Sequence, residues 1–362
     1  MRIILLTLLI NLALSLNVNA KIASVIGDPT TGEIFFEVNK DTRNYPASLT
    51  KMMTLYIIFD YLKNKKIAKD DKVKFSNYAA SQKPSKLNIP PGKSIKVYEL
   101  INGLIIKSGN DATVAIAEKI SGSEKKFVKL MNNYAKKLNM KSTNFANTNG
   151  LPNKSNLSSA YDMFLLGSSL YNDFPEFRKF FNKTRTTING VKYRTHNKLV
   201  AKYEYYKGLK TGYIRKSGFQ IALLGIFNNR PLLGIYFGGK SSKERNDKIH
   251  FLMRKVAKEN YTNINLKVDK DIKIKDKNNN KSKNLLKYKV QTSSFKDIKK
   301  SKFFVISLFK KNYTKDMVSL RHNIEKNGKY FITITDPVSK TIADEFCNML
   351  KVNKLDCIVK RI

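Results

Sequence analysis

Histidine and cysteine are scarce in this 362-residue sequence, which has three of the first and two of the second. The histidines (His196, His250 and His322) are far apart, and no close pair offers a zinc site. No G-x-S-x-G segment occurs either, so a conventional Ser-His-Asp hydrolase is not expected. We therefore expect no metal centre.

Acidic residues are also few, with 28 Asp and Glu against 68 Lys and Arg, which gives a net charge of +40. Most of the basic residues are lysines, and they are spread along the whole chain rather than gathered in one stretch. No zinc-finger spacing, RNP motif or basic-aromatic stripe accompanies them. Nucleic-acid binding is therefore not expected.

Long hydrophobic runs are limited to one, at the N-terminus. Met1-Arg2 precedes an apolar run from Ile3 to Leu16, and Val18-Asn19-Ala20 then supplies small residues for cleavage. Residues 1–20 are interpreted as a secretory signal peptide, with an uncleaved anchor as the alternative. Export would exclude ATP and most cytosolic cofactors, and we expect no cofactor.

The rest of the chain is expected to form two domains, at residues 21–260 and 287–362. A Lys- and Asn-rich stretch without periodicity, residues 261–286, would link them. In the first domain we expect a hairpin (22–27 and 32–36), helices over 48–63, 101–106, 111–120 and 242–259, and strands over 218–227 and 232–237 joined by a turn at 228–231. In the second we expect a strand over 288–292, a helix to about 309, two strands, a helix over 339–351 and a strand over 357–359.

The first chemical motif is Ser48-Leu49-Thr50-Lys51, which places a hydroxyl and an amine on one helix face. Serine needs a base to attack a carbonyl, and an amine serves when burial and nearby positive charge lower its pKa. Alone, the pattern also fits a helix cap followed by a solvated lysine.

Two further motifs follow the first. Ser108-Gly109-Asn110 falls at a break between expected helices, where side chains reach a cleft. Lys210-Thr211-Gly212 precedes the late strands, and a glycine-flanked edge strand lets a peptide pair with the backbone while Lys and Thr bind a carboxylate. In this order within an exported chain, the three motifs are a specific signal.

The three motifs resemble those of the penicillin-recognising serine enzymes. Over about residues 21–258, the chain resembles the D-alanyl-D-alanine carboxypeptidases, which are the low-molecular-mass penicillin-binding proteins. The matching segments are residues 45–54, 84–87, 108–112, 145–152, 196–197, 208–214, 217–219 and 238–239. The resemblance implies an α+β fold: a β-lactamase/transpeptidase-like domain with an antiparallel sheet flanked by helices, plus a helical cluster.

The resemblance also implies the catalytic roles. Ser48 would be the acylated nucleophile and Lys51 the base that takes its proton. Ser108 and Asn110 would line the cleft, with the serine relaying protons and the amide binding the peptide backbone. The backbone N–H groups of Ser48 and Tyr213 would form the oxyanion hole.

For substrate binding, the resemblance assigns the terminal carboxylate to Lys210 and Thr211, beside Gly212, with help from Arg245 and His196. Members of the carboxypeptidase family commonly carry Asp immediately before the glycine that precedes the third motif. In this chain that glycine is Gly208, and the residue before it is Lys207. A class A β-lactamase would have Asp in place of Gly109 and a deacylating Glu between residues 150 and 190, where Glu176 is the only glutamate.

The implied activity is removal of the terminal D-alanine from peptidoglycan stem pentapeptides, with β-lactams as covalent inhibitors. Stem peptides and glycan strands would be the partners, and the location would be the periplasm, in association with the cell wall. A D,D-endopeptidase and a non-catalytic peptidoglycan-binding protein are the alternatives, and the oligomeric state stays open.

Residues 288–291, 294–295 and 343–359 of the second domain resemble those of a SPOR domain, a βαββαβ ferredoxin-like module that in its family binds glycan strands. The resemblance makes Gln291, Ser294 and Tyr330 the binding candidates, and a ferredoxin-like domain of unrelated use is the alternative. Export makes Cys347 and Cys357 a candidate disulfide, because the short segment between them lets the final strand return beside the last helix. Two buried, reduced thiols are the other possibility.

Overall fold

The computed structural model describes residues 22–261 and, nearer the C-terminus, residues 288–295, 322–327, 330–335, 344, 347 and 357–361. The chain divides into two compact units, residues 1–267 and 268–362. The predicted signal peptide, the linker after Tyr261 and the predicted helix ending near Phe309 lie outside the described residues, as does the predicted helix over 339–351 except for Asp344 and Cys347.

A five-stranded antiparallel sheet forms the centre of the first unit, with the strand order β2-β1-β9-β8-β7. Its strands are β1 (Ala23–Gly27), β2 (Ile34–Val38), β7 (Tyr206–Ile214), β8 (Gly218–Phe227) and β9 (Arg230–Gly239). The predicted hairpin and late strands are confirmed. The turn between β8 and β9 is tighter than predicted, because Asn228 and Asn229 both adopt positive φ (48° and 60°) and close a two-residue hairpin.

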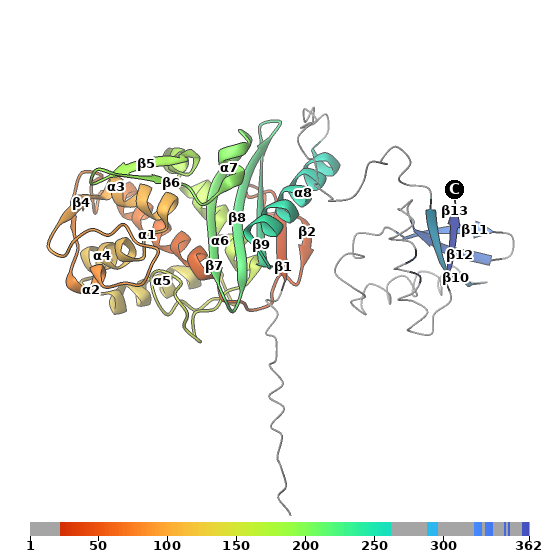
Figure 1. The fold of residues 1–362 in the computed structure, drawn as a ribbon, viewed down its shortest axis with the longest axis horizontal. Helices are drawn as coiled ribbons and strands as arrows, with labels where there is room; N and C mark the ends of the chain where they lie inside the picture. Colours follow the sequence, from red (N-terminus) through yellow and green to blue (C-terminus); the bar gives the residue numbers. More distant parts are fainter. Residues whose placement is uncertain are drawn as a thin grey trace, which may run out of the picture. The chain divides into compact units, whose positions relative to one another are not determined.

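The sheet is buried on both faces, which explains its nearly continuous apolar strands. In β8, Ala222 and Leu224 join the core on one face, and Ile221 and Leu223 join the core on the other. Helix α6 (Ala160–Asp173) covers the first face and helix α8 (Ser242–Asn260) the second (Figure 1). Because β7 is the outermost strand, one of its edges remains open for pairing.

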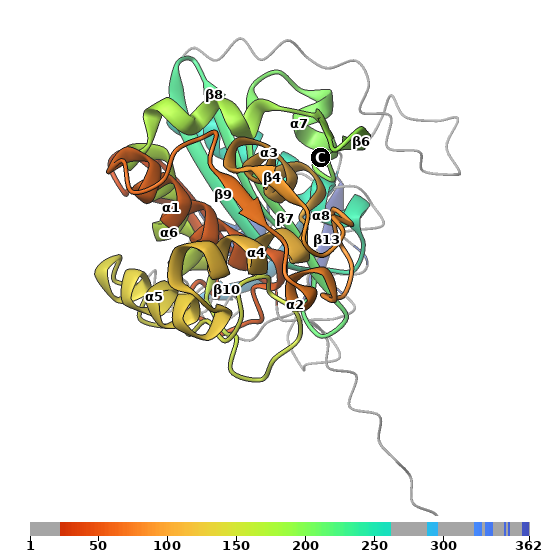
Figure 2. The ribbon, with the colours of Figure 1, turned by 90° about the vertical axis from the view of Figure 1, so that its left-hand side faces the viewer.

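A helical cluster lies beyond α6, in front of the strands in Figure 2. Its elements are the 3-10 turn η1 (Ala47–Thr50), α1 (Lys51–Lys63), α2 (Asn77–Ala80), α3 (Val97–Asn102), the π turn η2 (Gly103–Lys107), α4 (Asn110–Ser121) and α5 (Glu124–Lys137). Smaller elements are the ribbons β3 (Lys72–Lys74) with β4 (Ser94–Lys96) and β5 (Arg185–Ile188) with β6 (Val191–Arg194), the 3-10 segment η3 (Pro175–Asn182) and α7 (Lys198–Lys202). Turn η1 packs against β7, and the start of α1 therefore lies beside the open edge of the sheet.

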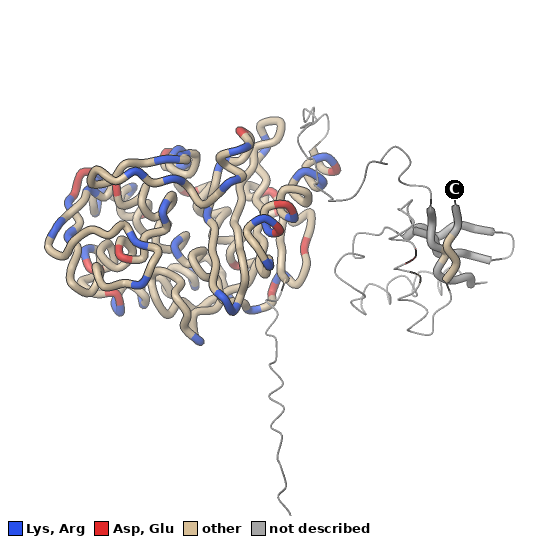
Figure 3. The backbone as a smooth tube through the Cα atoms, viewed as in Figure 1, with Lys and Arg blue, Asp and Glu red and all other residues tan. Residues whose placement is uncertain are grey.

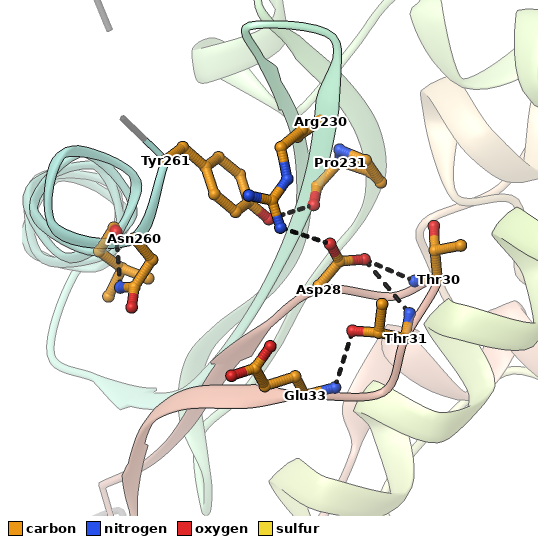
Figure 4. Close-up of polar contacts among 9 residues, drawn as sticks. Asp28, Thr30, Thr31, Glu33, Arg230, Pro231, Asn260 and Tyr261 are labelled. Atoms are coloured by element: carbon orange, nitrogen blue, oxygen red, sulfur yellow. Dashed lines mark hydrogen bonds and ion pairs between the residues drawn. The ribbon is translucent and has the colours of Figure 1, made fainter. Parts of the chain in front are cut away.

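The last described residue of this unit, Tyr261, is fixed to the sheet (Figure 4). Its hydroxyl donates to the Pro231 carbonyl at 2.7 Å, and the Arg230 guanidinium lies 4.0 Å from its ring centroid. Arg230 also lies 3.6 Å from the carboxylate of Asp28, which accepts from the N–H of Thr30 and so closes the β1–β2 turn. The end of α8 is thereby anchored to β9 and β1.

The second unit contains a four-stranded antiparallel sheet of β10 (Tyr288–Phe295), β11 (His322–Asn327), β12 (Tyr330–Thr335) and β13 (Ile358–Arg361). In the order β11-β12-β10-β13, the first strand lies between the third and the fourth. This order is the ferredoxin-like arrangement of a βαββαβ chain. A disulfide joins Cys347 to Cys357.

Charge is spread over the first unit: lysines and arginines occur along nearly every element, with acidic residues between them (Figure 3). Among the described residues, no helix combines the length and the apolar character needed to cross a membrane.

Candidate active site

The nucleophile segment is built by the passage from η1 into α1. Ser48 lies in the 3-10 turn and is half-buried, whereas Lys51, the first residue of α1, is fully buried. Helical geometry brings residues three apart onto one face, and Lys51 Nζ lies 3.2 Å from Ser48 Oγ. The alternative of a solvated surface lysine is therefore wrong.

Lys51 donates two short hydrogen bonds to neutral acceptors. One goes to Asn110 Oδ1 at 2.7 Å and the other to the main-chain carbonyl of Asn149 at 2.6 Å. Burial and the positive charge of Lys210 hold the pKa of Lys51 well below its usual range, against the opposing influence of Asp111. Burial and the charge environment therefore favour a neutral amine beside the hydroxyl.

The second motif shapes the opposite wall of the site. The π turn η2 ends at Ser108, which has left-handed φ and ψ angles of 64° and 40° and interrupts the helix before α4. Asn110 then donates from Nδ2 to the Lys83 carbonyl at 2.7 Å, which fixes the amide that faces Lys51. The Ser108 hydroxyl is buried and has no hydrogen-bond partner among the described residues.

The third motif lies on the edge strand β7, close to the nucleophile. A Cβ atom added to Gly212 would lie 3.1 Å from the backbone nitrogen of Ser48, so glycine permits this close approach. Lys210 is buried, and its Nζ donates to the Thr211 carbonyl at 3.0 Å. Burial and the charge of Arg245 lower the pKa of Lys210 to about 7.

Arg245 adds to a strongly positive environment, which also acts on His196. In the first turns of α8, the buried Arg245 guanidinium donates to the Gln220 carbonyl and to Asn246 Oδ1. Burial lowers the pKa of Arg245 to about 10. Partial desolvation and the charge of Lys210 lower the pKa of His196 to about 4, although its side chain is exposed. A bound carboxylate would relieve this repulsion.

The structure thus brings Ser48, Lys51 and Asn110 into direct contact, and places Gly212 beside Ser48. Thr211 is buried next to Lys210, whereas the Tyr213 side chain is 54% exposed and packs on Phe219, with ring centroids 4.2 Å apart. The predicted role of Tyr213 in the oxyanion hole uses only its backbone N–H group, so the exposure of its side chain does not conflict with that role.

The sequence interpretation missed the Asn149 carbonyl, because a main-chain acceptor has no signature in residue type. The segment Asn149-Gly150-Leu151-Pro152 was the available signal. Gly150 has a φ of 84°, and a Cβ atom there would lie 1.7 Å from the Ala47 carbonyl oxygen. Glycine is therefore required where this loop crosses the nucleophile turn.

The second unit gives less detail about its three candidate residues. Gln291 and Ser294 lie on β10 and Tyr330 begins β12, so all three belong to the two central strands of the sheet. Gln291 is half-buried. Among the described residues of the whole chain, no group of His, Cys, Asp or Glu is placed to hold a metal ion.

The family model of the D-alanyl-D-alanine carboxypeptidases, peptidase family S11, matches residues 11–241, which include all three motifs. The chain belongs to this family. Over 231 residues it is 36% identical to the D-alanyl-D-alanine carboxypeptidase DacF of Bacillus subtilis, a match that covers 63% of this chain and 59% of the relative. The chain spans about three fifths of the length of the curated carboxypeptidases that it matches.

Solved structures of penicillin-binding proteins share the fold. Penicillin binding protein 5 from Haemophilus influenzae matches with a TM-score of 0.62 and 34% identity, over 64% of this chain and 69% of that one. Penicillin-Binding Protein D2 from Listeria monocytogenes, in its ampicillin-bound form, matches with a TM-score of 0.57 and 28% identity, over 65% and 95%. The carboxypeptidase-family fold of antiparallel sheet and helices, predicted from the sequence, is therefore confirmed for the first unit.

Proposed function

We propose that this chain is a serine D-alanyl-D-alanine carboxypeptidase, which removes the terminal D-alanine from peptidoglycan stem pentapeptides. One observation carries the proposal: a fully buried lysine amine lies 3.2 Å from a half-buried serine hydroxyl and donates to two neutral acceptors. A protein that only binds peptides has no need of such a nucleophile-base pair.

In the acylation step, Lys51 Nζ takes the proton of Ser48 Oγ as the oxygen attacks the carbonyl carbon of the penultimate D-alanine. A neutral amine has two N–H groups and one lone pair. With the N–H groups directed at Asn110 Oδ1 and the Asn149 carbonyl, the lone pair is left for the Ser48 hydroxyl. The oxyanion forms beside the N–H groups of Ser48 and Tyr213, where fixed donors stabilise it without reorganisation.

Collapse of this tetrahedral species breaks the carbon–nitrogen bond, and the leaving D-alanine amine takes the proton from Lys51. The Ser108 hydroxyl, which has no partner in the part of the chain that the structure describes, is suited to relay that proton. Water then attacks the ester with Lys51 again as the base, which frees Ser48 and releases the shortened peptide.

Substrate binding relies on the third motif. The terminal carboxylate would sit near Lys210 and Thr211, in the positive environment that Arg245 reinforces. The peptide backbone would pair with the open edge of β7, since main-chain hydrogen bonds give affinity independently of the side chains. Gly212 keeps that edge close to Ser48.

The test measures D-alanine release from a synthetic stem pentapeptide by the full chain and by the Ser48→Ala variant. We expect release by the wild type and none by the variant, with thermal unfolding of both confirming that the variant folds. Cleavage of cross-linked peptides without release from pentapeptides would assign endopeptidase activity instead. Activity that survives in Ser48→Ala would refute the mechanism.

We also propose that residues 287–362 form a SPOR-type module that holds the catalytic domain (residues 21–260) at the wall, and that residues 1–20 direct export to the periplasm. The strand order of the second sheet supports the module's predicted topology. Co-sedimentation of the full chain with glycan strands stripped of peptides tests it: we expect binding, and weaker binding for Gln291→Ala combined with Tyr330→Ala. Equal sedimentation of both proteins would contradict these binding residues.

A further inference from the structure

The orientation of the Lys51 amine depends on a loop outside the three motifs. Of the two acceptors that Lys51 uses, Asn110 is fixed on α4, whereas the Asn149 carbonyl belongs to the irregular segment 146–152. If that carbonyl moved, an N–H group of the amine would lose its acceptor and the lone pair would lose its direction. Whatever holds this loop therefore controls the base.

Thr113 and Gln82 also contact this loop, at 3.1 Å from Thr148 Oγ1 and 3.2 Å from Asn149 Nδ2, but the charged group that holds it is Glu124, at the first position of α5. Its Oε1 accepts two hydrogen bonds from Thr148, the residue before Asn149: one from the backbone N–H at 3.1 Å and one from Oγ1 at 2.9 Å. Its Oε2 accepts from the hydroxyl of Tyr78 on α2 at 2.6 Å. The carboxylate thus ties the loop to two helices at once.

The loop is also tied to the helix that carries Lys51. The Thr54 hydroxyl, one turn after Lys51 on α1, donates to the Thr148 carbonyl at 3.0 Å. Thr148 is fully buried, so its polar groups need partners within the protein. Glu124 supplies an acceptor on one side of this residue, and Thr54 supplies a donor on the other.

Capping of α5 does not explain the placement of Glu124. An acidic residue in the first turn of a helix is favourable in itself. Here, however, Ser123 provides the cap by accepting from the Lys126 N–H. Both oxygens of Glu124 are bound by groups outside α5.

We propose that Glu124 is a positioning residue that holds the Asn149 carbonyl against Lys51 and so directs the lone pair of the amine at Ser48. This inference rests on the proposed function, because it assigns a role in the same acylation reaction. Glu124 acts through Thr148 and touches neither the substrate nor the nucleophile.

The experiment measures the rate constant of acylation by a fluorescent penicillin against pH, for the full chain and its variants. Glu124→Ala should lower the plateau rate about ten- to a hundredfold, the usual cost of misplaced reacting groups. The rising limb of this variant's rate profile should move to lower pH, because Lys51 loses an acceptor that stabilises its ammonium form. Lys210 and Asp111, the charged groups that act on Lys51, are unchanged in the variant. A site that had merely loosened and admitted water would move the limb to higher pH.

Three further variants separate positioning from charge and folding. Glu124→Gln should keep nearly the wild-type profile, because its amide oxygen accepts from Thr148 and its NH₂ group donates to the Tyr78 oxygen. Tyr78→Phe changes a side chain that is 53% exposed, and it should alter the plateau rate and the rising limb less than Glu124→Ala but in the same direction. This variant replaces Glu124→Ala in the test if Glu124→Ala does not fold. Glu118→Ala is the matched control, since Glu118 accepts from Ser76 and has no hydrogen bond to the loop, and it should leave the profile unchanged.

The possible outcomes are distinct. A wild type that penicillin does not acylate would overturn the proposed function itself. If the wild type is acylated, three results would overturn the role of Glu124 and leave the proposed function standing. These are an unchanged rate profile in Glu124→Ala, a rising limb of that variant's pH profile that moves to higher pH, and a Glu124→Gln variant as slow as Glu124→Ala.

Discussion

At the scale of single residues, the proposed mechanism gives two buried lysines opposite tasks. As a base Lys51 must be neutral, and as a carboxylate-binding group Lys210 must be charged. Burial lowers the pKa of both, and their mutual repulsion adds to the effect on Lys51. A substrate carboxylate would raise the pKa of Lys210 and restore its charge at the moment of binding.

This pair predicts a bell-shaped dependence of kcat/KM on pH. The rate should rise as Lys51 loses its proton, at a pH well below the usual lysine value of roughly 10.4. It should fall as Lys210 loses its proton in the free enzyme, near a pH of about 7. Steady-state hydrolysis of a pentapeptide across pH measures both limbs. A rate that climbs only near the usual lysine value would exclude Lys51 as the base.

The sequence motifs were sufficient to predict which side chains would lie together around the proposed nucleophile. Lys51 is joined by hydrogen bonds to Ser48 and Asn110, and the proposed reaction would require both these residue types and this spacing. The contributions of Asn149 and Glu124 could not be predicted. One acts through a carbonyl that every residue type has, and the other acts through a partner that tertiary packing alone brings near.

At the scale of elements, the site depends on a crossing of two loops. The turn that carries Ser48 and the loop that carries Asn149 pass so closely that Gly150 leaves no space for a side chain. Both loops contribute an atom to the environment of Lys51, so the tight crossing fixes their separation.

Gly150→Ala should therefore destabilise the protein more than a change in backbone preference explains. Its φ of 84° is unfavourable for alanine, and the added Cβ would also overlap the Ala47 carbonyl. The matched control is Gly122→Ala, with a φ of 75° and nothing within 4 Å of the added Cβ, which should cost only about 1–2 kcal/mol. Denaturant unfolding compares the two. An equal loss of stability would show that the crossing is not tight.

Helices α4 and α8 lie where they were expected, whereas α5 and α6, with 14 residues each, were not predicted. The helix of residues 48–63 was expected to be continuous, but it begins with the 3-10 turn η1, and α1 starts at Lys51. The ribbons β3–β4 and β5–β6 are only three or four residues per strand, too short for alternation to be recognised. Their pairing follows from the surrounding packing.

The whole molecule consists of two units that differ in how they are stabilised. The first has two buried cores, one on each face of its sheet. The second unit, residues 268–362, also has a covalent link, the disulfide between Cys347 and Cys357. A small domain benefits most from such a link, because its core contributes little.

Replacement of both cysteines by alanine should weaken the second unit alone. The bridge spans a sequence separation of 10, and its loss should lower the free energy of unfolding of that unit by about 2–4 kcal/mol. Denaturant unfolding of the full chain should show an earlier transition for one unit, while penicillin labelling of the first unit stays at the wild-type level. Free alkylation of both thiols without a reductant in the wild type would contradict the bridge.

The most direct test of the whole account is the site of penicillin attachment. The full chain is incubated with benzylpenicillin, its intact mass is measured, and the adduct is mapped by digestion and mass spectrometry. We expect one adduct per chain, on Ser48, and none on Ser48→Ala, because in the proposed mechanism Lys51 activates that hydroxyl alone. An adduct on another residue, or undiminished labelling of Ser48→Ala, would contradict it.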